Sequence, residues 1–164
     1  MIRRAMGALV ALVSVAAVVH PALGWGYSAH RIVTEAAVRD VPGPLGAFLL
    51  DRLQLVSDLS LEPDTRLKQD DPDEAHRHYF EVDLLLPAGP ADVSSVPHDL
   101  PAARRKYGDA MLRKTGILPW WIAVRTTALA EAMRRGDADA IIHEAAYLSH
   151  YVADLHQPLH LTRN

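Results

Sequence analysis

The sequence contains no cysteine, so disulfide bonds cannot hold its fold together. Beyond the first 24 residues it has no second apolar run long enough to span a membrane, no long run of strand-like alternation and no internal repeat. A metal ion bound only by the folded chain would supply a constraint comparable to that of a disulfide. The sequence therefore predicts an all-α fold, built as a single helical domain.

Residues 1–24 have the three parts of a secretory signal peptide. Arg3 and Arg4 form a basic start, residues 8–19 are apolar, and the small residues Ala22 and Gly24 suit a cleavage site. An uncleaved anchor is the alternative, although the apolar run is shorter than a typical membrane span. We expect a secreted or periplasmic protein whose domain covers residues 25–164, with no stable membrane insertion after cleavage.

The charge balance is acidic, with 17 Lys and Arg against 20 Asp and Glu and a net charge of −3. Cleavage would remove Arg3 and Arg4 and bring the net charge to −5. This sign excludes a protein that grips nucleic acid through a broad basic surface. Each bound zinc ion would, however, add two positive charges locally. Eight of the nine histidines would remain after cleavage, which is more than an ordinary domain needs.

The densest group of candidate metal ligands lies near the C-terminus, in the run HYVADLHQPLH. His150 and Asp154 are one helical turn apart and would share a face. Pro158 cannot continue that helix, so the chain should turn there and bring His160 back towards the same space. Imidazole and carboxylate ligands without cysteine are typical of catalytic zinc. The alternative is a polar helix end whose histidines lie near free carbonyl groups.

Further candidates lie upstream. His30 falls in the first turn of a helix that Ser28 could cap, a place where a cationic imidazole is unfavourable and a neutral one beside a metal fits better. Asp64 and His78 stay open as ligands, whereas the acidic run 70–73 is interpreted as a solvated loop.

Breaks in the pattern predict the remaining elements. We expect a helix over residues 45–55, a polar loop over 57–73, an irregular segment over 73–83 and a long loop over 84–101. Three helices should follow: one over 102–115, one over 119–135 ended by Gly136, and a last one capped by Asp137 or Asp139.

Four motifs occur in the order Trp25-Gly26-x3-His30, Pro63-Asp64, His78-Tyr79 and His150-x3-Asp154-x-His156-Gln157-Pro158-Leu159-His160. This set resembles the trinuclear zinc phosphodiesterases, which comprise the single-strand-specific nucleases of the S-one/P-one class and bacterial zinc-dependent phospholipase C. The resemblance covers nearly all of residues 25–164, which correspond to the N-terminal part of a usual family member.

The resemblance implies the ligands of a three-zinc centre. Asp64, His78, His150 and Asp154 look like the ligands of one zinc ion. His160 looks like one of the three ligands of another.

It also implies how the remaining zinc ion is held and where water is activated. The free amine and carbonyl of a terminal Trp25 would bind this ion together with His30, and Asp154 would bridge it to the first. Asp83 falls where nucleases of this type have a carboxylate that orients or activates water, so Asp83 and Asp154 are the predicted catalytic residues. His156 is interpreted as an orienting group.

The family pattern continues with a glycine-rich stretch and a His-x3-Asp or His-x3-Glu segment, and the sequence ends at Asn164 without them. It is interpreted as a fragment or a naturally short form that completes two zinc sites at best. The expected protein is a monomeric secreted nuclease that hydrolyses single-stranded nucleic acid or nucleotides. A phospholipase C acting on phospholipid and a non-catalytic zinc-binding helical protein are the alternatives.

Overall fold

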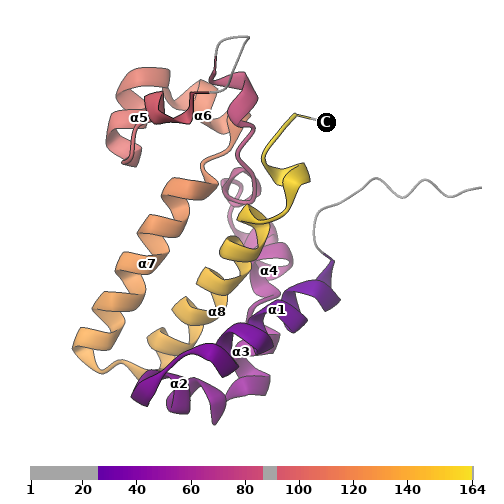
Figure 1. Cartoon of the computed structure of the whole chain (residues 1–164), viewed down its shortest axis with the longest axis vertical. Helices are drawn as coiled ribbons and strands as arrows, with labels where there is room; N and C mark the ends of the chain where they lie inside the picture. Colours follow the sequence, from indigo (N-terminus) through magenta and orange to yellow (C-terminus); the bar gives the residue numbers. More distant parts are fainter. Residues whose placement is uncertain (1–25, 87–91, 164) are drawn as a thin grey trace, which may run out of the picture.

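The structure of the protein is a computed structural model, which is described here for residues 26–86 and 92–163 (Figure 1). Within these ranges every regular element is helical, and the all-α prediction is confirmed. In chain order the elements are α1 (Tyr27–Asp40), α2 (Gly43–Leu50), α3 (Leu53–Leu59), η1 (Glu62–Asp64), α4 (Arg66–Asp70), η2 (Ala75–Arg77), η3 (Val82–Leu84), η4 (Val93–Ser95), α5 (Leu100–Tyr107), α6 (Asp109–Thr115), α7 (Leu118–Arg135), α8 (Ala138–Leu155) and η5 (Pro158–His160), where η denotes a 3₁₀ helix.

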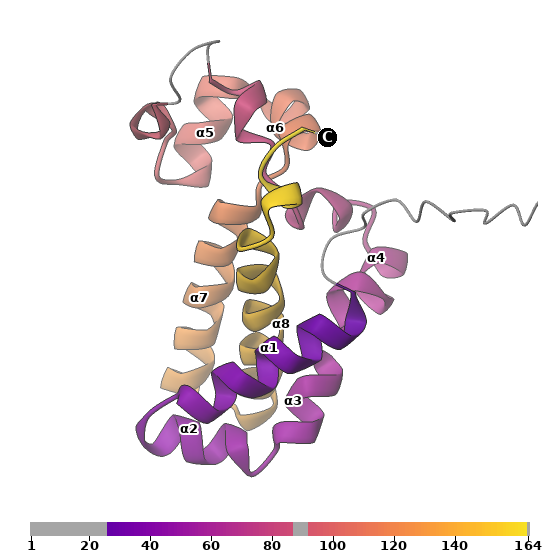
Figure 2. The same ribbon diagram turned by 45° about the vertical axis from the view of Figure 1, so that its right-hand side comes forward.

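Helix α8 is the central element of the molecule. It runs antiparallel to α7 along the long axis, and α1 and α3 pack on it as well (Figures 1 and 2). Helices α5 and α6 lie at the end of this bundle where α7 begins and α8 ends (Figure 2). A side chain on α8 can therefore meet side chains from both halves of the chain.

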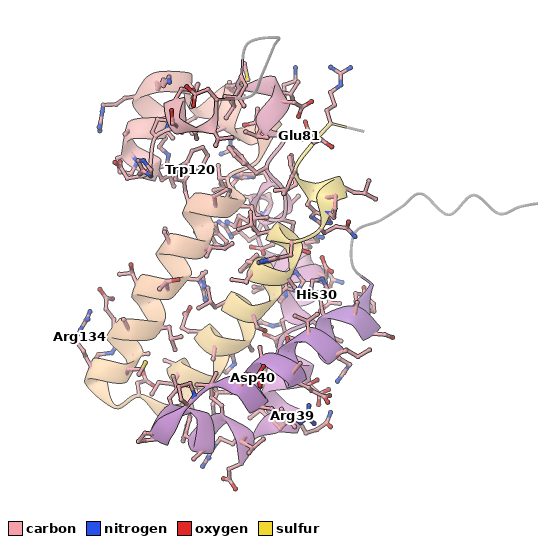
Figure 3. All side chains as sticks on the ribbon, viewed as in Figure 1. His30, Arg39, Asp40, Glu81, Trp120 and Arg134 are labelled. Carbon is pink, nitrogen blue, oxygen red and sulfur yellow. The ribbon has the colours of Figure 1, made fainter. Side chains whose placement is uncertain are left out.

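The turn between α7 and α8 forms as the sequence predicts. Gly136 adopts a left-handed conformation with φ +64° and ends α7, and the Asp137 side chain accepts a hydrogen bond of 3.1 Å from the amide of Ala140 to cap α8. Trp120 and Arg134 mark the two ends of α7 (Figure 3). Trp120 is buried against Phe80, whereas Arg134 is exposed at the helix C-terminus, where its charge is favourable.

Several predicted boundaries are wrong. Helix α1 begins at Tyr27 with Gly26 in the cap position, so Ser28 lies inside the helix and caps nothing; His30 is still in the first turn. Residues 45–55 form two helices, because the backbone leaves helical geometry at Arg52.

The predictions of one helix over residues 102–115 and of a loop over residues 57–73 are also wrong. Gly108, with φ +77°, splits the expected helix over 102–115 into α5 and α6. The expected loop over 57–73 contains the end of α3 together with η1 and α4. The irregular segment over 73–83 carries only short 3₁₀ turns, as its mixed pattern suggests.

The segment 76–82 is fixed by backbone hydrogen bonds on both of its sides. On one side, the amides of Ile117 and Leu118 donate to the carbonyls of residues 76 and 79, at 2.8 and 3.2 Å. On the other side, the amide of Phe80 donates to the carbonyl of His160 at 2.7 Å. His78 thus lies on a strap held between the start of α7 and the end of the described chain.

The predicted signal peptide lies outside the described residues. Among residues 26–86 and 92–163, no helix has the length and apolar character that crossing a bilayer requires.

Gly116 makes the close approach of this strap possible, and its replacement by alanine should be costly. Its φ is +78°, and an added Cβ would lie 2.0 Å from the carbonyl oxygen of Tyr79. We expect Gly116→Ala to lower the free energy of unfolding by about 3 kcal/mol, measured by urea denaturation, because backbone strain and overpacking add.

Gly136→Ala is the matched control for this substitution. Its φ is also positive, at +64°, but an added Cβ would meet nothing within 4 Å. Only the backbone term remains, so a loss of about 1 kcal/mol is expected. Equal losses for the two variants would contradict the proposed close contact at Gly116.

Candidate metal centre

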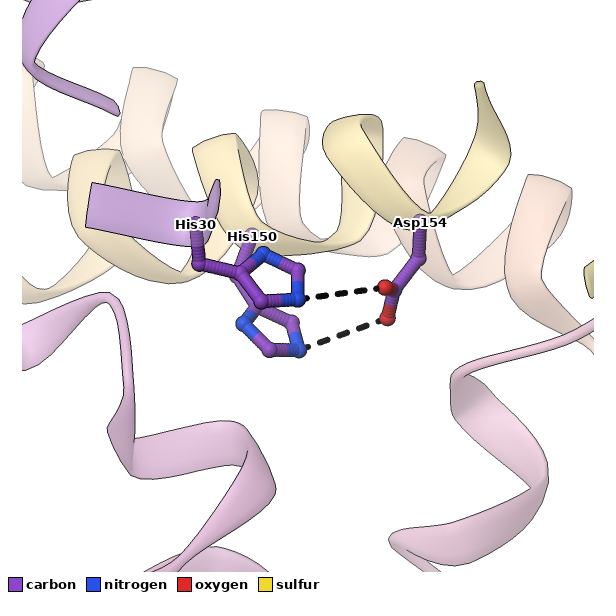
Figure 4. Close-up of side chains that lie close together, drawn as sticks. All are labelled: His30, His150 and Asp154. Atoms are coloured by element: carbon purple, nitrogen blue, oxygen red, sulfur yellow. Dashed lines mark ion pairs between the residues drawn. The ribbon is translucent and has the colours of Figure 1, made fainter. Parts of the chain in front are cut away.

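Five predicted ligand residues come together at one place in the fold. They are supplied by α1 (His30), the end of η1 (Asp64), the strap (His78) and α8 (His150 and Asp154). Figure 4 shows the members from α1 and α8, with ion pairs joining both imidazoles to the carboxylate. Within two groups, His30–His150–Asp154 and Asp64–His78–His150, the ligand atoms all lie within 4.8 Å of one another. These buried groups could hold a metal ion.

The two oxygens of the Asp154 carboxylate face different histidines. Oδ1 lies 3.4 Å from Nε2 of His30. Oδ2 lies 2.9 Å from Nδ1 of His78 and 3.3 Å from Nε2 of His150. A carboxylate that bridged two cations would present one oxygen to each, so this geometry permits the bridging role that the resemblance implies for Asp154, which stays a prediction.

The tautomer of His150 follows from its second ring nitrogen. Nδ1 lies 2.8 Å from the carbonyl oxygen of Ser60, which can only accept a hydrogen bond, so this nitrogen carries the proton. Nε2 then offers a lone pair towards Asp154 and Asp64, which also present only lone pairs. A cluster of acceptors of this kind is stable only with a positive charge among them.

His30 is buried with unsatisfied ring nitrogens, which also favours a cation at the centre. It is 1 % exposed, and among the described residues neither ring nitrogen makes a hydrogen bond, although Nε2 faces the carboxylates of Asp154 and Asp64 at 3.4 and 3.8 Å. Its ring stacks on that of His150 with centroids 3.9 Å apart. Leaving a buried polar nitrogen without a partner costs about 1–3 kcal/mol, so Nε2 fits a metal ligand better than a packing residue.

The pKa shifts show the same need for positive charge. Burial disfavours the ionised form of Asp154, but its contacts with His150, His30 and His78 outweigh this and hold its pKa well below the usual range. Burial lowers the pKa of His150. For His78, burial is outweighed by hydrogen bonds to Asp154 and Glu74, which raise its pKa. Without a metal, a proton on His78 supplies the compensating charge.

Asp64 lies at the accessible edge of the group. Its carboxylate is 3.5 Å from Nδ1 of His78 and 3.8 Å from Nε2 of His30, and its side chain is 18 % exposed. Lys68, one turn along the chain, donates to it at 2.6 Å. A ligand would approach the buried histidines from this side, past Asp64.

The other predicted site residues have different outcomes. His160 returns towards the centre after Pro158, with Nδ1 donating to the carbonyl of His78 and lying 4.0 Å from Asp154. Its Nε2 is the atom left for a ligand role, outside the two groups above. Asp83 is not brought into either group: it is exposed and accepts a hydrogen bond of 3.1 Å from the amide of Arg163. Trp25 lies outside the described residues.

Sequence reasoning missed one acidic residue at the centre. Glu74 follows the acidic run 70–73, yet it is 1 % exposed and lies 3.1 Å from Nε2 of His78. The four-residue spacing between Glu74 and His78 could have indicated this contact. It was missed because Glu74 directly follows an acidic run that was interpreted as a solvated loop.

Comparison of the chain with protein-family models, with curated proteins and with solved structures gave no match in any of the three. The centre is therefore defined by its own geometry.

His150 belongs to both groups and Asp154 contacts histidines of both, so removing either side chain should remove metal binding from both. We expect His150→Ala, like Asp154→Asn, to abolish binding of Zn²⁺ used as a probe in isothermal titration calorimetry. His143→Ala is the control, because His143 lies two turns earlier on α8, where Nδ1 donates to the carbonyl of Asp139. It should bind the probe as the unaltered chain does. Equal loss in all three variants would show that the ligand face has been misassigned.

Proposed function

We propose that this chain is a secreted zinc-dependent phosphodiester hydrolase that cleaves single-stranded nucleic acid. The observation that carries the proposal is the convergence of His30, His78 and His150 on the two oxygens of Asp154. These ligands are nitrogen and carboxylate oxygen only, the set that zinc takes in hydrolytic sites. The choice of nucleic acid as substrate is supported by the sequence resemblance.

The residues divide between two adjacent ions. Asp64, His78, His150 and Asp154 would hold one, and His30 with Asp154 would contribute to the second. Bound zinc lowers the pKa of a coordinated water to about 7 and neutralises charge on a phosphoryl oxygen. Hydrolysis adds water across a P–O bond and yields a phosphomonoester and a free hydroxyl group.

The charge balance of the centre suits an anionic substrate. Two divalent ions would carry four positive charges against the two carboxylates of Asp64 and Asp154, and Lys68 adds one more beside Asp64. The net charge of the whole chain is −3, so this would be a local positive site in an acidic protein. A phosphodiester would be drawn to the accessible side, where Asp64 and His160 are partly exposed.

Zinc should stabilise the folded chain strongly, because its ligands come together only on folding. At a free concentration a thousandfold above the dissociation constant, binding adds about 4 kcal/mol, which corresponds to a rise in melting temperature of about 10 °C. Differential scanning calorimetry with Zn²⁺, with Mg²⁺ and after EDTA treatment checks this. Equal melting temperatures under all three conditions would remove the basis of the proposal.

The proposed activity is tested with the full, zinc-loaded chain on three substrates: single-stranded DNA, the same DNA as a duplex, and phosphatidylcholine vesicles. We expect cleavage of the single strand, reduced to the level of the EDTA-treated protein by Asp154→Asn and retained by His143→Ala. Hydrolysis of the phospholipid alone would indicate a phospholipase C. A chain that binds zinc and cleaves none of the three would be a non-catalytic metal binder.

A further inference from the structure

Glu74 is a buried carboxylate outside both groups of candidate ligands. It lies at the cap of η2, four residues before His78 on the strap. Only 1 % of its surface is exposed, and a buried carboxylate persists only when its oxygens are fully hydrogen-bonded.

Both oxygens of Glu74 are engaged by donors on different elements. Oε1 accepts from Nε2 of His78 at 3.1 Å and from the hydroxyl of Tyr151 on α8. Oε2 accepts from the guanidinium of Arg77 at 2.7 Å. Burial disfavours the ionised form, but these three bonds outweigh it and lower the pKa of Glu74 to about 2.

The partners of Glu74 are themselves held in place. The guanidinium of Arg77 also binds Asp71 at 2.7 Å and lies 4.1 Å from the ring centroid of Trp121 on α7. Tyr151 is 1 % exposed in the core, with its ring against those of His78 and His150. The position of the carboxylate is thus fixed by α7, α8 and the strap together.

This position decides which nitrogen of His78 can bind a metal. An ionised carboxylate only accepts, so Nε2 of His78 carries a proton that it donates to Glu74. Without a metal, Nδ1 is protonated as well and faces Asp154 at 2.9 Å and Asp64 at 3.5 Å. A cation at the centre would replace that proton, so Nδ1 is the nitrogen that becomes a ligand. His150 has the other tautomer. Its Nδ1–H donates to the carbonyl of Ser60, so its Nε2 faces the centre.

We propose that Glu74 is a positioning residue that selects the Nε2–H tautomer of His78 and directs its Nδ1 to the metal. Second carboxylate partners of this kind orient ligating histidines and raise their basicity, and their loss weakens metal binding by about 10–100-fold. The inference rests on the proposed metal-binding function. It adds a residue that touches neither the ion nor the substrate.

The first test replaces Glu74 by its isosteric amide. In Glu74→Gln, an NH₂ group must face either Arg77 or His78, so one donor meets another donor. We expect the affinity of the tightest Zn²⁺ site to fall by about 10–100-fold in calorimetric titration. Tyr151→Phe keeps the bond between Glu74 and His78 and should lower the affinity less.

Glu144→Gln is the matched control. Glu144 also lies in the bundle, on α8, and pairs with Arg125 at 2.7 Å, but it belongs to neither ligand group. It should bind zinc as the unaltered chain does. An equal loss in Glu144→Gln and Glu74→Gln would overturn the inference, because it would show a general effect of removing a partly buried carboxylate.

The second test needs no variant. Long-range ¹H–¹⁵N spectra of the zinc-loaded chain, labelled with ¹⁵N-histidine, report which ring nitrogen of each histidine carries a proton. We expect His78 as the Nε2–H tautomer and His150 as the Nδ1–H tautomer. A proton on Nδ1 of zinc-bound His78 would overturn the role of Glu74, whereas an unaltered chain that binds no zinc would overturn the proposed function itself.

Discussion

The whole centre depends on one ionised carboxylate, that of Asp154, which is buried in the last turn of α8. Asp154 is 1 % exposed, and taking an ionised carboxylate out of water costs several kcal/mol unless other groups compensate for it. Three imidazoles do so, and they come from α1, from the strap and from α8 itself. Each of these elements must dock correctly for the charge to be tolerated. The polar centre and the packing of the bundle therefore depend on one another.

Neighbouring groups fix which ring nitrogen of His78 and of His150 faces the centre. Glu74 and the carbonyl of Ser60 each accept a hydrogen bond from the N–H of a ring nitrogen that faces away from the centre, which leaves the opposite nitrogens facing inward. His30 has no such partner on either nitrogen, so its contribution depends most on an added cation. The result is an inward-facing set of nitrogen and oxygen atoms that could hold a metal ion.

How much of this could be predicted depends on the sequence separation of the residues concerned. The pairing of His150 with Asp154 and the end of α7 at Gly136 are local features that the sequence predicts correctly, and it limits the cap of α8 to Asp137 or Asp139. The approach of His30, Asp64 and His78 to α8 is non-local, and no periodicity encodes it. The residues alone left these three open as candidate ligands, and only the resemblance to a family pattern implied that they meet α8 at one centre.

The errors have physical causes as well. Gly108 breaks a helix that the apolar pattern alone would continue, and a one-residue break is difficult to place from composition. Glu74 was overlooked because an acidic run usually lies in solvent, whereas the strap turns this one carboxylate inward. Asp83 was given its role by the resemblance, and in the structure it lies outside both ligand groups and accepts a hydrogen bond from the backbone amide of Arg163; its catalytic role stays a prediction.

One measurement tests the central claim directly: diffraction from zinc-soaked crystals on both sides of the zinc absorption edge. The account predicts an anomalous peak bounded by Oδ2 of Asp154, Nδ1 of His78 and Nε2 of His150. It predicts a second peak on the other side of the same carboxylate, against Nε2 of His30. A soaked crystal with the five side chains in place and no anomalous density among them would contradict it.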